Sequence, residues 1–230
     1  MESVVLDTIP FELDTGELLQ TLRIKEGSEH VETVQRLAQE ARAIARPKAL
    51  YKPVSVEEKG DDWVVVDGVR LASRVLRVNL DKADQVFAYV ATGGVELDAW
   101  VNAFDDEMLH QYWADWIAET ALRSATAALD EHLETHYHLK HGSTMSPGSL
   151  PDWPLQEQRA LFTILGNTRD SIGVQLTDSF LMLPKKTVSG VCFPTEEDFA
   201  SCQLCPRDEC RRRKAPFDPE LFASKYREAG

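Results

Sequence analysis

Four cysteines lie close together near the C-terminal end of this 230-residue chain, and the sequence contains no others. They are Cys192, Cys202, Cys205 and Cys210, separated by nine, two and four residues. Four thiolates are the ligand set of a tetrahedral zinc ion or of a cubane iron–sulfur cluster. The cysteines therefore predict one metal centre in this part of the chain.

Three interpretations differ in what the thiols hold. A structural zinc ion would fasten a C-terminal segment in which apolar residues for a core are scarce. A 4Fe–4S cluster needs the same ligands, and the Cys205-Pro206 step is typical of the end of ferredoxin motifs. Disulfides are the weakest alternative, because the N-terminus lacks the pattern of a secretion signal and cytoplasmic thiols stay reduced. The spacing alone does not separate zinc from a cluster.

Composition excludes several classes of function. A formal net charge of −13 argues against general nucleic-acid binding, which needs a basic surface. No apolar run is long enough to span a membrane, so we expect a cytoplasmic protein. The exception in charge is local, because Arg211, Arg212, Arg213 and Lys214 directly follow the last cysteine. This basic run is either a solvated stretch, a counter-charge for a thiolate-bound cluster, or a docking patch for an acidic partner.

Periodicity predicts a mixture of helices and strands without a βα repeat, which is the α+β class. Apolar spacing predicts a helix that starts after Ser28 and ends before Pro47. Asp67-Gly68 predicts the turn of a hairpin, and 86–90 reads as a buried strand. Helical spacing then continues from 96 to about 136, with a possible break at Asp105-Asp106.

Histidines crowd the end of this long helical stretch, at positions 132, 136, 138 and 141. His132 and His136 are four residues apart, a spacing that can chelate a metal on a helix face. Polar residues at a helix C-terminus are the ordinary explanation. Residues 142–154 follow as a loop rich in Pro, Gly and Ser that we expect to be an ordered binding loop. The segment 187–193 reads as a last strand that ends at the first cysteine.

Residues 144–193 resemble the activation (reactivation) domain of cobalamin-dependent methionine synthase. The resemblance rests on Ser146-Pro147-Gly148 with the prolines that follow, on Leu161-Phe162, and above all on a long stretch from Ile172 to Phe193. That stretch carries Ile172-Gly173-Val174-Gln175-Leu176-Thr177-Asp178-Ser179-Phe180, Met182-Leu183-Pro184 and Val188-Ser189-Gly190. The strong part of the match covers about a quarter of the chain.

The resemblance implies a single curved α+β domain, with a twisted antiparallel sheet flanked by helices. We assign it to residues 1–191, with 192–230 as a C-terminal metal-bound tail. In the family, this domain caps cobalamin while inactive cob(II)alamin is reduced and then methylated by S-adenosylmethionine. The resemblance places the residues that face the corrin and the ligand in one loop and one strand: Thr144, Ser146, Pro147, Gly148, Ser149, Ser189 and Gly190.

The chain departs from the family pattern inside that loop. Thr144 stands where the family has an arginine, and Ser149 stands where it has a tyrosine. A tyrosine expected near Val191-Cys192 is also replaced. An arginine can hold a ligand carboxylate with two charge-assisted hydrogen bonds and a threonine cannot, so binding of S-adenosylmethionine stays open. If that ligand binds, Glu119 on the long helix is a candidate for its ammonium group.

These observations predict the reactivation component of a cobalamin-dependent methyltransferase system. An iron–sulfur cluster on the four cysteines would take an electron from ferredoxin or flavodoxin and pass it to cob(II)alamin. The cobalamin would be bound to a partner, a separate methionine synthase or corrinoid methyltransferase. The alternative is a zinc-stapled adaptor that docks on the same partner and transfers no electrons.

Overall fold

The computed structural model describes residues 2–139, 142–195, 199–207, 209–210 and 213–226. Its elements, in chain order, are β1 (Val4–Leu6), α1 (Thr15–Thr21), α2 (His30–Ile44), β2 (Lys48–Lys59), β3 (Trp63–Val66), β4 (Val69–Ala72), α3 (Arg74–Asn79), β5 (Gln85–Thr92), α4 (Val95–Asn102), α5 (Met108–Tyr137), β6 (Gly142–Met145), η1 (Leu155–Glu157), α6 (Gln158–Leu165), α7 (Thr168–Ile172), β7 (Gln175–Leu176), β8 (Met182–Leu183), β9 (Thr187–Pro194), η2 (Ser201–Leu204) and η3 (Phe222–Tyr226).

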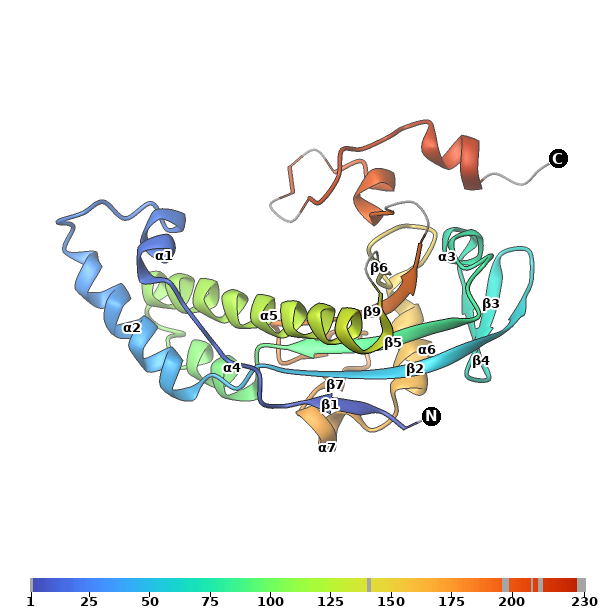
Figure 1. The fold of residues 1–230 in the computed structure, drawn as a ribbon. Helices are drawn as coiled ribbons and strands as arrows, with labels where there is room; N and C mark the ends of the chain where they lie inside the picture. The colour runs from blue at the N-terminus through green and yellow to red at the C-terminus, as the bar shows by residue number, and fades with distance from the viewer. Residues whose placement is uncertain (1, 140–141, 196–198, 208, 211–212, 227–230) are drawn as a thin grey trace.

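An antiparallel sheet forms the centre of the molecule, with seven strands in the described part of the chain. Its order is β4-β3-β2-β5-β9-β6, and β1 also pairs with β2. The long strand β2 pairs with β5 along one edge, and its other edge is divided between β1 and β3. The predicted α+β class with a twisted antiparallel sheet and flanking helices is confirmed (Figure 1).

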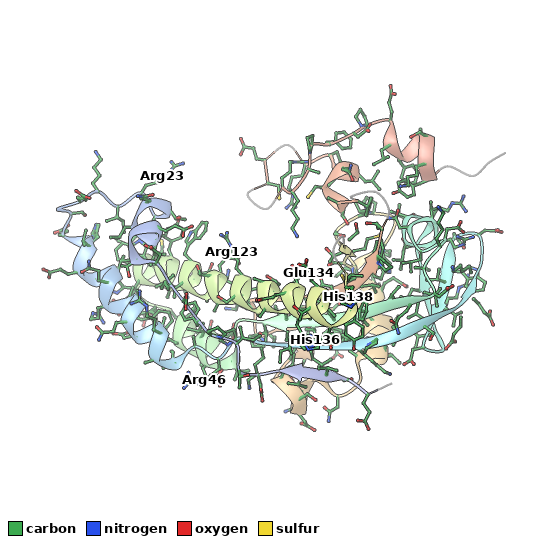
Figure 2. All side chains as sticks on the ribbon, in the orientation of Figure 1. Arg23, Arg46, Arg123, Glu134, His136 and His138 are labelled. Carbon is green, nitrogen blue, oxygen red and sulfur yellow. The ribbon has the colours of Figure 1, made fainter. Side chains whose placement is uncertain are left out.

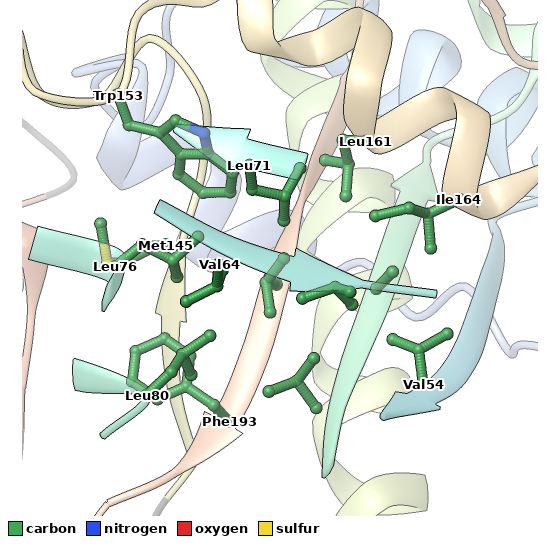
Figure 3. Packing of buried hydrophobic residues seen from close by; sticks show 14 of the residues in the cluster. Val54, Val64, Leu71, Leu76, Leu80, Met145, Trp153, Leu161, Ile164 and Phe193 are labelled. Atoms are coloured by element: carbon green, nitrogen blue, oxygen red, sulfur yellow. The ribbon is translucent and has the colours of Figure 1, made fainter. Parts of the chain in front are cut away.

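Alternation along the strands supplies a core on each face of the sheet. On one face Tyr51, Phe87 and Tyr89 pack beneath the second half of α5. On the other face Val86, Val90 and Val191 pack against α6 and α3, in the cluster that also buries Trp153, Leu161 and Phe193 (Figure 3). The first half of α5 packs instead against α1, α2 and α4. The long helix therefore joins a helical end of the molecule to the sheet.

Several predicted elements are confirmed. Helix α2 begins at His30, whose amide donates to Ser28 Oγ at 3.3 Å. The hairpin β3–β4 turns at Asp67 and Gly68, which have φ values of 53° and 73°, as a two-residue hairpin turn of this kind requires. The long helical stretch is broken between α4 and α5, at the predicted acidic step. None of the described helices is both long enough and apolar enough to cross a membrane.

Three elements were not anticipated from the sequence. The start of the expected binding loop is strand β6, because residues 142–145 pair with β9. Helix α1 lies in the N-terminal stretch before the predicted helix, and Asp14 caps it by accepting from the Glu17 amide at 2.9 Å. Strand β2 tolerates Pro53 because this residue lies between the β1 and β3 pairings, where that edge of β2 has no neighbour among the described strands.

The C-terminal segment is attached to the core at both ends. Phe199 and Tyr226 are 8% and 1% exposed, and both belong to the core cluster on the α6 face. The Tyr226 hydroxyl donates to Asn79 Oδ1 at 2.9 Å. In Figure 1 this red segment rises at one end of α5 while α1 and α2 rise at the other, which gives the molecule its curved outline.

Candidate functional site

The candidate site forms where β6 and β9 pair at the edge of the sheet. Thr144 lies directly opposite Cys192, so residues from the predicted loop and from the cysteine set share one face of the sheet. Gly190 lies next to them, opposite Tyr89 of β5. A Cβ atom at Gly190 would lie 2.3 Å from the Met145 carbonyl oxygen, so only glycine allows the chain to approach this closely.

The residues that were expected to face a ligand come from the loop and from β9, and all but one of them lie close together. Ser146 and Ser149 are linked by a 2.6 Å hydrogen bond from Ser149 Oγ to the Ser146 carbonyl oxygen. Pro147, between Ser146 and Gly148, is buried. Gly148 has a φ of 83°, and its amide donates to the Trp153 carbonyl at 2.7 Å. Ser189 is the exception, because it faces the opposite side of the sheet.

Ser189 is 1% exposed, and its hydroxyl donates to Gln158 Oε1 on α6 at 2.8 Å. Because successive residues of a strand point to opposite faces, Ser189 and Gly190 cannot both face the loop. Of these two predicted residues, Gly190 lies with the loop and Ser189 belongs to the core on the α6 side.

Tyr89 and Asp130 complete this face of the site and were missed in the sequence. The hydroxyls of Ser146 and Thr144 hydrogen-bond to the Tyr89 phenol, while burial raises the pKa of Tyr89 far above its usual range. Asp130 of α5 lies near enough for its negative charge to raise the pKa of both Tyr89 and Cys192, and desolvation of its own carboxyl raises its pKa. The alternation of the predicted strand at 86–90 could have indicated that Tyr89 faces away from Val90. No pattern in the sequence singles out Asp130.

The four cysteines are free, with no disulfide among them. Cys192 is 4% exposed within β9, and burial, aided by the negative charge of Asp130, raises the pKa of its thiol to about 12. Cys202 belongs to the short helix η2, and Cys205 and Cys210 follow it in irregular structure. These three thiols are partly exposed. The set thus has one buried member in the sheet and three members in the segment above it.

Two links bring the segment to Cys192. Ser201 Oγ donates to the carbonyl oxygen of Thr144 at 3.4 Å, which places the start of η2 beside the strand pair that holds Cys192. The Lys214 amide donates to Cys202 Sγ at 3.3 Å. The positive charge of the Lys214 ammonium works to lower the pKa of both Cys192 and Asp130, against the larger effect of burial. The donor set is therefore gathered in one region and is chemically suited to a thiophilic metal.

Gathering is not the same as coordination. Within the described residues, no three Cys, His, Asp or Glu side chains converge into a group that could hold a metal ion. The four-cysteine centre thus stays a prediction that rests on the number and chemistry of the thiols and on their common location.

The histidine pair has a different environment. His132 Nε2 and the Tyr51 hydroxyl are 2.9 Å apart, and His136 Nδ1 donates to the His132 carbonyl at 2.9 Å. The two rings stack with centroids 3.9 Å apart. Figure 2 shows His136 and His138 where α5 ends. One nitrogen of each ring is therefore engaged in a hydrogen bond within the fold.

Other predicted residues lie elsewhere or outside the described part. Glu119 is 8% exposed on α5, with Lys186 Nζ at 3.6 Å from its carboxylate and Arg123 Nε at 4.0 Å. These cations already neutralise it, so it is a poor candidate for a ligand's ammonium group. His141, Arg211 and Arg212 lie outside the described residues.

Comparison with known proteins gives a family match that covers both the loop and the cysteines. A family profile described as the activation domain of vitamin B12 dependent methionine synthase matches residues 66–212, a range that includes the loop and all four cysteines. Thirteen chains of solved structures match the fold. One is a crystal structure of the MetH reactivation domain bound to AdoHcy, with a TM-score of 0.59 and 18% identity over 87% of this chain and 80% of that one. A search of curated protein sequences gives no significant match.

Proposed function

Because the chain belongs to the family of vitamin B12 dependent methionine synthase activation domains, we propose that it reactivates a cobalamin-bound methyltransferase by delivering an electron through its four cysteines. The partner that carries the cobalamin is a methionine synthase or a corrinoid methyltransferase. The electron enters from a small donor protein such as ferredoxin or flavodoxin.

The pairing of Thr144 with Cys192 carries this proposal. It joins the loop that resembles the corrin-facing loop of the family to the first of the four thiols, on one face of the sheet. A redox centre held by Cys192, Cys202, Cys205 and Cys210 would therefore lie beside the surface that docks the corrin. Electron transfer requires such proximity, whereas a purely structural metal could lie anywhere in the fold.

The chemistry required is a one-electron reduction followed by methyl transfer. Cob(II)alamin accepts one electron and becomes cob(I)alamin, which then attacks a methyl donor to give methylcobalamin. When bound, a 4Fe–4S cluster supplies a one-electron carrier, and such clusters reach potentials as low as about −700 mV. The four thiols of this chain would hold that carrier, and the Lys214 ammonium would offset part of its negative charge.

The tail is anchored independently of any metal, which favours a redox role over a structural staple. Phe199 and Tyr226 are buried in the core at the two ends of the segment that carries three of the cysteines. A zinc ion is a necessary staple where such burial is lacking. Here the protein core itself holds the segment, so the fold does not need a structural metal and a bound metal can have a catalytic or redox role.

We also propose S-adenosylmethionine as the methyl donor, although Thr144 and Ser149 supply no charge for its carboxylate. Its ammonium group has a candidate partner in Asp130, whose negative charge acts on the pKa of Tyr89 and of Cys192. The solved relative bound to AdoHcy carries the corresponding product. Calorimetric titration with S-adenosylmethionine tests this part separately: wild type should bind, and Asp130→Asn should bind at least tenfold more weakly. No binding by the wild type would refute it and leave the redox proposal standing.

The decisive experiment for electron delivery is the iron, zinc and sulfide content and the visible spectrum of protein purified without oxygen. A brown protein with about four irons and four sulfides is expected. Cys205→Ser should lose the colour and the reduction of cob(II)alamin by a photoreduced donor, while His136→Ala serves as the matched control and should keep both. A colourless wild type with one zinc ion would refute electron transfer and support the docking adaptor.

A further inference from the structure

The segment that carries three of the cysteines folds around a single side chain, Arg213. Its Nη1 donates to the carbonyl oxygens of Cys202 at 3.1 Å and Ala215 at 3.3 Å. Its Nη2 donates to the carbonyl of Cys205 at 3.3 Å and to that of Arg207. One guanidinium therefore binds four backbone carbonyls that belong to different parts of the segment.

The backbone of the same stretch supplies two more contacts. The Arg213 amide donates to the Cys210 carbonyl at 3.1 Å, and the next amide, that of Lys214, donates to Cys202 Sγ at 3.3 Å. Arg213 thus contacts the peptide groups of all three cysteines in the segment, and Lys214 contacts one of their sulfur atoms.

Irregular backbone needs such partners, because its carbonyl groups have no neighbours in a helix or strand to bind them. A guanidinium suits this task better than an ammonium, since its planar fork presents five N–H donors in fixed directions. Arg213 is half-buried, and both terminal nitrogens are occupied by the segment itself. It is therefore neither a solvated charge nor an available contact for an acidic partner, two of the roles that the basic run had suggested.

We propose that Arg213 is the positioning residue of the metal centre: it fixes the backbone that presents Cys202, Cys205 and Cys210, while the Lys214 amide tunes the Cys202 sulfur as its hydrogen-bond donor. This inference rests on the proposed function, because it assumes that the four cysteines bind a metal. Outer contacts of this kind orient metal ligands, and N–H donors to sulfur raise the potential of iron–sulfur centres.

Cobalt(II) is the probe for Arg213, because its visible bands report tetrahedral thiolate coordination without any redox activity. Arg213→Gln should bind cobalt(II) roughly tenfold to a hundredfold more weakly than wild type. Arg213→Lys, which keeps the charge and loses the fork, should fall between the two. Thermal unfolding of the metal-free proteins checks that each variant is folded, and Arg213→Lys keeps the test open if the glutamine variant is not.

Lys214 allows a matched pair of variants for the N–H···S contact. Lys214→Ala keeps the amide, whereas Lys214→Pro removes it. Both variants lose the ammonium and should lower the midpoint potential of the iron-loaded protein. Only the proline variant should also shift the thiolate-to-cobalt charge-transfer band, and its potential should fall below that of the alanine variant.

The outcomes separate the two proposals. Wild-type protein that binds neither cobalt(II) nor iron would refute the proposed function and this inference together. Wild-type protein that binds metal, with Arg213→Gln equal to it in affinity and Lys214→Pro equal to Lys214→Ala in spectrum and potential, would overturn the inference alone.

Discussion

The histidine pair at the end of α5 and the cysteine segment above the β6–β9 edge both have spacings that can chelate a metal, but their surroundings differ. The histidine rings stack at 3.9 Å and bond to Tyr51 and to their own helix. In the cysteine segment the hydrogen bonds engage mainly the backbone, and the thiols remain free. The first group is tied to its neighbours through its rings, whereas the second is tied mainly through its main chain.

The comparison teaches that spacing alone does not identify a ligand set. A residue can bind a metal only if its donor atoms are not already committed to the fold. His132 packs beside Tyr51 beneath the aromatic face of the sheet, where a polar ring atom must find a partner. In the C-terminal segment, Arg213 binds the main-chain carbonyls of Cys202 and Cys205 rather than their thiols.

The largest expected effect is on metal content. The double variant Cys202→Ser and Cys205→Ser should lose the bound metal completely, because two of four ligands are removed. The double variant His132→Ala and His136→Ala should keep the full metal content of the wild type. Elemental analysis of both proteins makes the measurement. Metal loss in the histidine variant would break the comparison.

The second effect is on stability and should have the opposite order. His132→Ala leaves the buried Tyr51 hydroxyl with only its longer, 3.5 Å hydrogen bond to the Tyr137 hydroxyl and should lower the free energy of unfolding by about 1–2 kcal/mol. Cys202 is partly exposed, so Cys202→Ser should change the free energy of unfolding of the metal-free protein by no more than about 0.5 kcal/mol. Urea denaturation with chelator present measures both. Equal losses in the two variants would contradict the view that His132 supports the fold and Cys202 does not.

The smallest effect is a pH dependence that arises from His132. Burial, followed by the charge of His136, lowers the pKa of His132 below its usual 6.5. The unfolded chain then takes up a proton more readily than the folded one, so stability falls as the pH drops below about 6.5. Denaturation midpoints from pH 8 to pH 5 should show this decline in wild type and a smaller decline in His132→Asn. A decline of the same size in the asparagine variant would assign the effect to another group.

Local signals in the sequence predicted the elements that depend on neighbouring residues. Asp67-Gly68 specified the hairpin turn, because both residues must accept a positive φ. The Asp105-Asp106 step marked the break before α5. The sequence also carries a local signal for α1, since Asp14 precedes Glu17 at the spacing of a helix cap.

Elements that depend on distant partners could not be predicted in the same way. Residues 142–145 have the composition of a loop, and they form β6 only because β9 offers a free edge. Ser189 was grouped with Gly190, but the pleat of β9 points its side chain toward Gln158. Asp130 joins the site because α5 crosses this face of the sheet, which no local pattern reveals.

The sequence by itself determined the family, the α+β class and the four thiols, because motif, periodicity and residue chemistry are local properties of the chain. Only the tertiary structure decided that Thr144 and Cys192 are neighbours, that Arg213 binds the main chain of the cysteine segment, and that His132 pairs with Tyr51. The physical reason is that the partner available to each polar atom is set by packing between segments far apart in the chain.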